Sequence, residues 1–201
     1  MATARFAHAV SELSRARDMV ALGQSLFSMM GGRVDPSDMY RAAIVQAVST
    51  MDHYFHGVLI DRAVDMIVGR STVTASESRK VGLTFDAVRE ITQAPTVADQ
   101  ELVARKHAAA RLAKETLQQP DDIAVALGMV GVPAVWVTAF GSNAKAQKVA
   151  LGLVVTRRNR IAHQSDGDPL NPGKPTPISD ADALTAINTV DRVLTSIDPL
   201  C

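Results

Sequence analysis

The side chains best suited to chemistry lie in one short stretch of the second half of the chain. Residues 157–166 read RRNRIAHQSD, so three arginines and one histidine stand close together. An arginine guanidinium grips a phosphate through two parallel hydrogen bonds, and a histidine exchanges a proton near neutral pH. The alternative interpretation is purely structural, because positive charge at the C-terminal end of a helix complements the helix macrodipole.

The spacing around this motif predicts that Arg158 lies on the buried side of a helix. Positions three and four apart share one helix face, and here that face consists of Leu151, Val154, Val155, Arg158, Ile161 and Ala162. A guanidinium on such a face needs an anion or a wet cleft to offset its desolvation. Asn159 stands four residues before His163 and could orient its imidazole. Arg158 and His163 differ by about 140° around the helix, so they converge only if the arginine folds over the helix end or a second subunit supplies a facing copy.

A second cluster, DHYFH at residues 52–56, has three interpretations. Asp52, His53 and His56 have spacings at which one helix face presents metal ligands, although His8 or His107 would have to supply another ligand. In the second interpretation, a partly buried histidine bonds Asp52 inside the core. In the third, Asp52 or His56 reaches the arginine–histidine motif and supports it.

The composition indicates a single soluble domain without a disulfide framework. The 201 residues are 47% hydrophobic and carry 21 basic and 21 acidic side chains, so a polyanion site must come from local clustering. The only cysteine is Cys201, which excludes an internal disulfide and a cysteine-based zinc site and favours a reducing cytoplasm. No apolar run is long enough for a signal peptide or a membrane span, so we expect no membrane association.

Low aromatic content and the absence of period-two alternation predict an all-α fold, one domain over residues 1–201. Pro36, Thr96 and Ser179 are predicted to mark helix starts. Polar and proline-rich segments predict loops at 69–82 and 164–178. The helices are expected over 5–30, 36–68, 83–94, 96–118 and 121–128, then from 133 through the motif, and finally over 179–197.

The motif and its position resemble the HEPN superfamily, most closely the RiboL-PSP-HEPN group. Residues 158–163 read RNRIAH, which is similar to the family signature of an arginine, a polar residue and a histidine a few positions later. HEPN domains are multi-helix all-α bundles in which this motif lies at the C-terminal end of a late helix and a further helix follows. The resemblance therefore implies a HEPN-like bundle that forms a homodimer.

The resemblance also implies a metal-independent endoribonuclease of toxin or antiviral-defence type that needs no cofactor. In that case His163 is the general acid or base, Arg158 binds the phosphate and the transition state, and Asn159 is the orienting polar group. Arg157 and Arg160 lie outside the family pattern, and we expect them to bind the RNA backbone. RNA is the expected substrate, and an antitoxin or another defence-system protein is a candidate partner.

Two other classes of function stay open at this point. One is a catalytically silent HEPN-like module that binds RNA, a nucleotide or a protein. The other is a helical metalloprotein centred on His53 and His56, which the metal content of the purified protein would distinguish from the first.

Overall fold

The structure is a computed structural model that describes residues 3–71 and 81–201. As predicted, the described part of the chain is all-helical and contains no strand. Its elements are α1 (Ala4–Met29), α2 (Ser37–Ile67), α3 (Phe85–Gln93), α4 (Val97–Leu112), α5 (Pro120–Met129), α6 (Val135–Phe140), the 3-10 turn η1 (Gly141–Asn143), α7 (Ala144–Gln164), α8 (Asp180–Ile197) and the 3-10 turn η2 (Asp198–Leu200).

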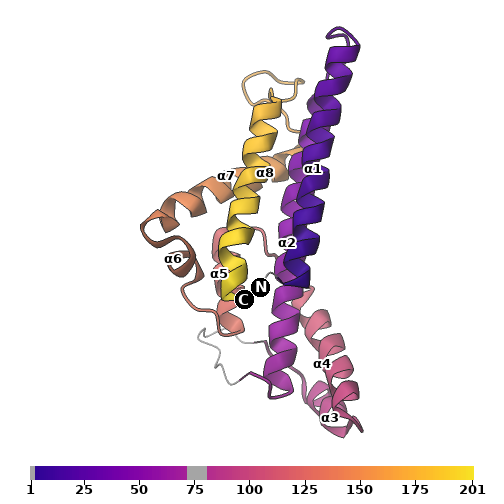
Figure 1. Ribbon diagram of the computed structural model, residues 1–201, viewed down its shortest axis with the longest axis vertical. Helices are drawn as coiled ribbons and strands as arrows, with labels where there is room; N and C mark the ends of the chain where they lie inside the picture. Colours follow the sequence, from indigo (N-terminus) through magenta and orange to yellow (C-terminus); the bar gives the residue numbers. More distant parts are fainter. Residues whose placement is uncertain (1–2, 72–80) are drawn as a thin grey trace.

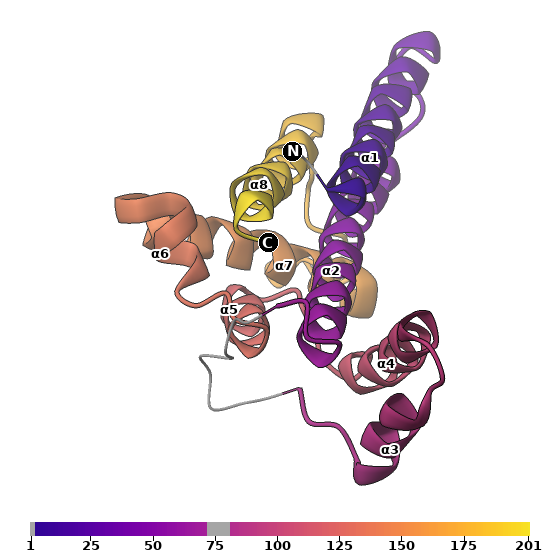
Figure 2. The ribbon, with the colours of Figure 1, turned by 60° about the horizontal axis from the view of Figure 1, so that its bottom comes forward.

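The long helix α2 is the element against which most of the others pack. Helix α1 runs beside it along the long axis of the molecule, and α8 contacts both (Figure 1). The α3–α4 pair lies at the C-terminal end of α2, whereas α5, α6 and α7 lie on a different side of it (Figure 2). The motif helix α7 is thereby held between α2 and α8.

One main hydrophobic core joins these helices. Leu13 of α1, Met51 and Phe55 of α2, Leu151 of α7 and Ile187 of α8 are all fully buried in it. Burying one large apolar side chain contributes on the order of 1.5–3 kcal/mol, so the shared core is what fixes α7 against the rest. A smaller cluster around Val64, at the end of α2, holds the α3–α4 pair.

Small residues allow α1 and α2 to approach closely. A Cβ added to Gly23 of α1 would stand 2.9 Å from a ring carbon of Tyr40 on α2, closer than real contacts of this kind. Asp198, which follows α8, connects α2 to the start of α1. It is buried and accepts hydrogen bonds from Tyr54 Oη at 2.8 Å and from Thr3 Oγ1 at 2.9 Å. Burial, together with the bond to Asp198, raises the pKa of Tyr54 above its usual value.

The prediction of one continuous helix from Pro133 into the motif is wrong. Ala134 takes a left-handed conformation with φ 50°, α6 ends at Phe140, and Gly141 has φ 54° and ψ −127°, which a helix cannot contain. Glycine adopts such angles at little cost because it lacks a Cβ. Helix α7 therefore begins only at Ala144, still long enough to carry the motif at its end.

Other predicted boundaries differ by smaller amounts. The helix expected over 96–118 ends at Leu112, and Pro36 is the N-cap of α2 rather than its first residue. Thr96 and Ser179 cap α4 and α8 as predicted, each accepting a backbone N–H three residues on. Residues 72–80 of the expected 69–82 loop lie outside the described residues, and the later loop begins at Ser165, just past the end of α7.

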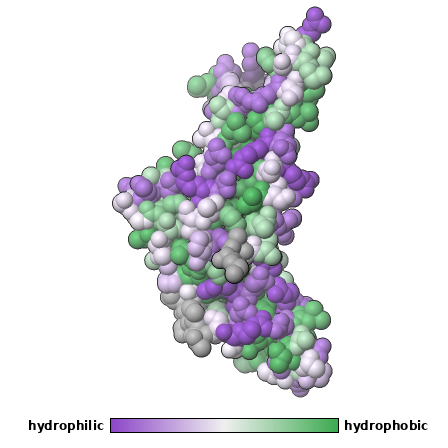
Figure 3. Space-filling model, viewed as in Figure 1, coloured by the Kyte–Doolittle hydropathy of each residue, from purple (hydrophilic) through white to green (hydrophobic). Residues whose placement is uncertain are grey.

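Hydrophilic and hydrophobic residues are interspersed on the face seen in Figure 3, as on most globular surfaces. Within residues 3–71 and 81–201, none of the helices combines the length and the apolar character that crossing a membrane requires.

Candidate functional site

Helix α7 ends in a strained turn directly after the motif. Ser165 and Asp166 both have left-handed backbones, with φ 50° and 51°, and the Asp166 amide donates to the Arg160 carbonyl oxygen at 3.0 Å. Residues other than glycine rarely adopt this conformation, and two in succession need support from elsewhere.

Asp166 provides that support through a buried ion cluster. Its side chain is fully buried, and Oδ2 accepts from Arg41 Nε of α2 at 3.0 Å and from Arg157 Nη2 of α7 at 2.7 Å. Its carbonyl oxygen accepts from the Thr176 amide at 2.7 Å. A single carboxylate thus connects α2, the end of α7 and the loop that returns to α8.

Arg157 belongs to this internal cluster. Besides Asp166, its Nη2 donates to the carbonyl oxygens of Thr176 at 3.1 Å and Pro177 at 3.2 Å. Hydrogen bonds from Ser179 lower the pKa of Asp182 below its usual value, and the positive charge of Arg157 lowers it further. This geometry gives Arg157 Nη2 a structural role, and the expected contact of Arg157 with the RNA backbone stays a prediction.

Arg158 has a different environment from its neighbour. It follows the fully buried Leu151 and Val155 on the inner face of α7, and its Nε is buried without a hydrogen-bond partner. Its Nη1 donates to two neutral amide oxygens, Asn159 Oδ1 at 3.1 Å and Gln118 Oε1 at 3.3 Å. In the described part of the chain no carboxylate forms an ion pair with it, so its charge is available to an anion.

The hydrogen bond to Asn159 turns the Arg158 guanidinium toward the histidine side of the helix. Asn159 stands four residues before His163, which corresponds to only about 40° around the helix. Within the described residues no hydrogen bond joins Arg158 to His163, so both expected routes to convergence stay predictions. The expected Asn159–His163 contact is not formed, because the amide oxygen bonds Arg158 instead. His163 itself is exposed, and residues 3–71 and 81–201 place no hydrogen-bond partner against it.

Unsatisfied buried polar atoms concentrate in this motif. Buried polar atoms are normally hydrogen-bonded, so each exception needs a reason. In the described residues the buried side-chain atoms without a partner are Arg157 Nε, Arg158 Nε, Arg160 Nε and Asp166 Oδ1. Three of these are guanidinium Nε donors at one helix end.

Arg160 reaches toward the loop that follows α7. Hydrogen bonds from the Asn171 side chain and the Leu170 amide lower the pKa of Asp168 below its usual value, and the positive charge of Arg160 lowers it further. Arg160 is partly buried and has no carboxylate within ion-pair distance among the residues that the structure describes. The expected contact of Arg160 with RNA thus stays a prediction that this position permits.

The Asp52–His56 pair reaches the motif indirectly. His56 Nε2 lies 3.2 Å from the Glu115 carbonyl oxygen, and Asp52 Oδ1 accepts from the Leu117 amide at 3.0 Å. These contacts fix the segment after α4, whose Gln118 bonds Arg158. His56 is also partly buried, and its Nδ1 lies 2.9 Å from the Asp52 carbonyl oxygen and 3.7 Å from the Asp52 carboxylate. The second interpretation of DHYFH, a partly buried histidine bonded to Asp52, is therefore the one that these contacts match, and support of the arginine–histidine motif is only indirect, through Gln118.

His53 and His56 face different parts of the molecule. His53 points to α1, where its ring centroid lies 6.1 Å from that of His8, while His107 is paired with Glu90 on α3. No group of three or more His, Cys, Asp or Glu side chains within residues 3–71 and 81–201 is arranged to hold a metal ion. The metal interpretation of DHYFH therefore finds no support in this arrangement.

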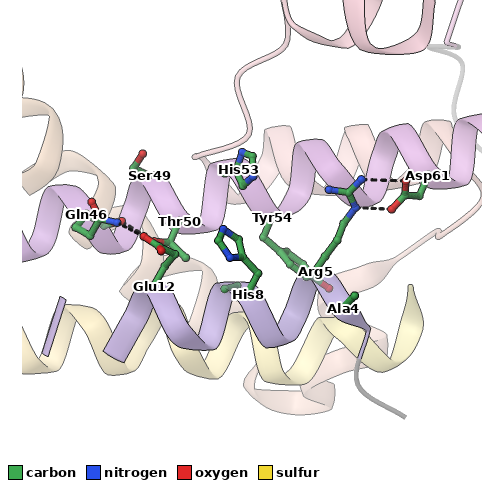
Figure 4. Close-up of a pocket in the computed structure, with 11 residues that line it drawn as sticks. Ala4, Arg5, His8, Glu12, Gln46, Ser49, Thr50, His53, Tyr54 and Asp61 are labelled. Carbon is green, nitrogen blue, oxygen red and sulfur yellow. Dashed lines mark hydrogen bonds and ion pairs between the residues drawn. The ribbon is translucent and has the colours of Figure 1, made fainter. Parts of the chain in front are cut away.

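A pocket of about 610 Å³ lies in the groove between α1 and α2 (Figure 4). Polar bridges between the helices cross it on either side of the His8–His53 pair: Gln46 donates to Glu12 at 2.8 Å, and Arg5 Nη2 donates to Asp61 at 3.0 Å. These two bridges satisfy Glu12, Gln46, Arg5 and Asp61, whereas His8 and His53 meet only through their rings.

Comparison with known proteins gives no match. No protein-family model fits the chain, and no curated protein and no solved structure is similar enough to count as a relative.

We predict that Asp166→Asn strongly destabilises the fold. Removing one partner of a buried ion cluster costs about 3–5 kcal/mol, because two guanidinium groups lose their counter-charge. The measurement is chemical unfolding of the purified variant. Asp38→Asn is the matched control, since the Asp38 side chain pairs with the same Arg41 but is 96% exposed. Equal stability losses in the two variants would contradict the anchoring role of Asp166.

Proposed function

We propose that this protein is a metal-independent endoribonuclease of the HEPN type. The observation that carries the proposal is the state of Arg158: a half-buried guanidinium, held by neutral amides, with a buried Nε that lacks a partner. A phosphate would supply the counter-charge that this guanidinium lacks. His163 is exposed near the same helix end.

The reaction is an internal transfer at phosphorus. His163 takes the proton of a ribose 2′-OH, the 2′-oxygen attacks the adjacent phosphorus, and the bond to the 5′-oxygen breaks. Arg158 donates hydrogen bonds to the phosphate oxygens as negative charge develops on them. The leaving 5′-oxygen takes up a proton, and the products are a 2′,3′-cyclic phosphate and a 5′-hydroxyl. Because the nucleophile is the 2′-oxygen of the RNA itself, the step needs no metal-bound hydroxide.

A second subunit would complete this site. One imidazole cannot accept the 2′-OH proton and protonate the leaving oxygen in the same concerted step, whereas two copies of His163 can divide these roles. Five residues on the outer face of α7 follow one another at alternating spacings of four and three, the spacing at which two helices pair. This seam consists of Val149, Leu153, Thr156, Arg160 and His163. Val149 and Leu153 are 57% and 68% exposed, so the first part of the seam presents apolar side chains to a second copy, while its second part presents Thr156, Arg160 and His163.

The catalytically silent RNA-binding module remains the second candidate, because the same free guanidinium would bind RNA without cleaving it. Only the chemistry of the products separates the two. A toxin or defence role, with an antitoxin partner, rests on the family resemblance alone.

We predict that His163→Ala lowers RNA cleavage by about 100-fold or more, the typical contribution of a general acid or base. An exposed side chain at a helix end contributes little to the core, so the helical circular dichroism and the unfolding midpoint should stay unchanged. His8→Ala is the matched control, because His8 is also an exposed helical histidine but lies on α1. Full activity in a pure, folded His163→Ala sample would remove the catalytic role.

The same assay tests Arg158. An ammonium keeps the charge but loses the planar two-point grip on phosphate, so Arg158→Lys should lose activity by about tenfold or more. Arg15→Lys, at a side chain that is 70% exposed on α1, is the control. Equal activity of the two variants would show that Arg158 does not grip the phosphate.

We also predict that the active form is a dimer built on α7. Leu153→Asp places a charge in the seam and should yield a monomer with low activity, and dilution of the native protein should lower activity per chain. Leu102→Asp is the control, since Leu102 is 70% exposed on α4. Light scattering gives the mass of each variant. A fully active monomer at every concentration would contradict the shared site.

A further inference from the structure

A second pocket, of about 970 Å³, lies beside the end of the motif helix. It opens between α1, α2, the last turn of α7 and the loop after it, and its volume lies within the range of small-molecule sites. The residues that carry its chemistry are Met19, Arg41, Val45, Ile161, Gln164 and Lys174. Ile161 and Gln164 belong to the same last turns of α7 that carry His163, although His163 itself does not line the pocket.

The walls of the pocket are largely apolar. Met19 of α1, Val45 of α2 and Ile161 of α7 come from three helices that are fixed by the main core. Such walls suit a neutral group without charge, because an ion placed there would lose its hydration.

Arg41 can offer a ligand only the face of its guanidinium. Its edge donors are engaged: Nε with Asp166, Nη1 with Ser37 and Asp38, and Nη2 with the Thr176 carbonyl oxygen. A guanidinium whose edge is occupied still stacks on a planar ring. Since its charge is balanced by buried Asp166, it attracts a flat aromatic group rather than a free anion.

The edge of the pocket at the end of α7 carries polar side chains that are free to bind a ligand. Gln164, Ser165 and Lys174 line the pocket, and in the described part of the chain their side chains have no hydrogen-bond partner. The Gln164 amide offers both a donor and an acceptor, so it can form paired hydrogen bonds with the edge of a base. The Lys174 ammonium can bind a phosphate.

We propose that this pocket binds a nucleobase of the RNA next to the scissile phosphate and gives the enzyme its base preference. The base stacks on Arg41 between the apolar walls, Gln164 reads its edge, and Lys174 holds a flanking phosphate. The assignment of an RNA substrate rests on the proposed function, whereas the pocket and its free groups do not.

The test measures binding separately from cleavage. Short, fluorescently labelled 2′-O-methyl oligonucleotides of A, C, G or U cannot be cleaved through the 2′-oxygen, so their anisotropy on the native protein reports binding alone. We expect one base to bind at least about fivefold more tightly than the weakest, the discrimination that one read edge provides. Gln164→Ala should remove this preference, and Ile161→Trp, with its fold checked by circular dichroism, should weaken binding of the preferred base by filling the pocket.

Gln93→Ala is the matched control, because Gln93 is likewise an exposed glutamine at the last residue of a helix. Equal affinities for the four bases, or a preference that survives Gln164→Ala, would overturn the pocket assignment even in an active ribonuclease. A preference that Gln164→Ala removes, in a protein that cleaves no RNA, would support the pocket and reject the proposed catalysis.

Discussion

The buried carboxylate of Asp166 is the contact on which the arrangement of the motif depends. It pairs with both Arg41 and Arg157, supports two left-handed residues after α7 and connects α2 to the returning loop. Asp166 pairs with Arg157 and Arg41, whereas Arg158 is held by the neutral amides of Gln118 and Asn159 and has no carboxylate partner in the described part of the chain. One ion cluster thus builds the helix end and separates the environments of two neighbouring arginines.

Local signals in the sequence were sufficient for much of the fold. Caps at Thr96 and Ser179 mark helix starts because the side chain and the backbone that it bonds lie within one turn. The three- and four-residue spacing around Leu151 correctly placed Arg158 on the inner face of α7. Gly141 was the local signal that was missed, since the apolar pattern around it continues while its backbone leaves the helix.

Pairings between distant residues could not be read from local patterns. Arg41 and Asp166 are 125 positions apart, so nothing near the motif indicated that Arg157 would be used internally and Arg158 left free. Gln118 had no distinguishing sequence signal, and its contact with Arg158 follows from how Asp52 and His56 fix the segment after α4. His53 and His56 lie on the same helix, but His53 faces α1 and His56 contacts the segment after α4, so the two side chains point to different sides.

The most direct test of the central claim is the chemistry of the product ends. RNA is incubated with the native protein in excess chelator, and the fragments are analysed by mass spectrometry, beside a substrate with one 2′-deoxyribose at the cleaved position. We expect 2′,3′-cyclic phosphate and 5′-hydroxyl ends, and no cleavage of the deoxy substrate, because the 2′-oxygen is the nucleophile. Cleavage that stops on chelation, returns with added metal and proceeds equally on DNA would contradict the proposed reaction.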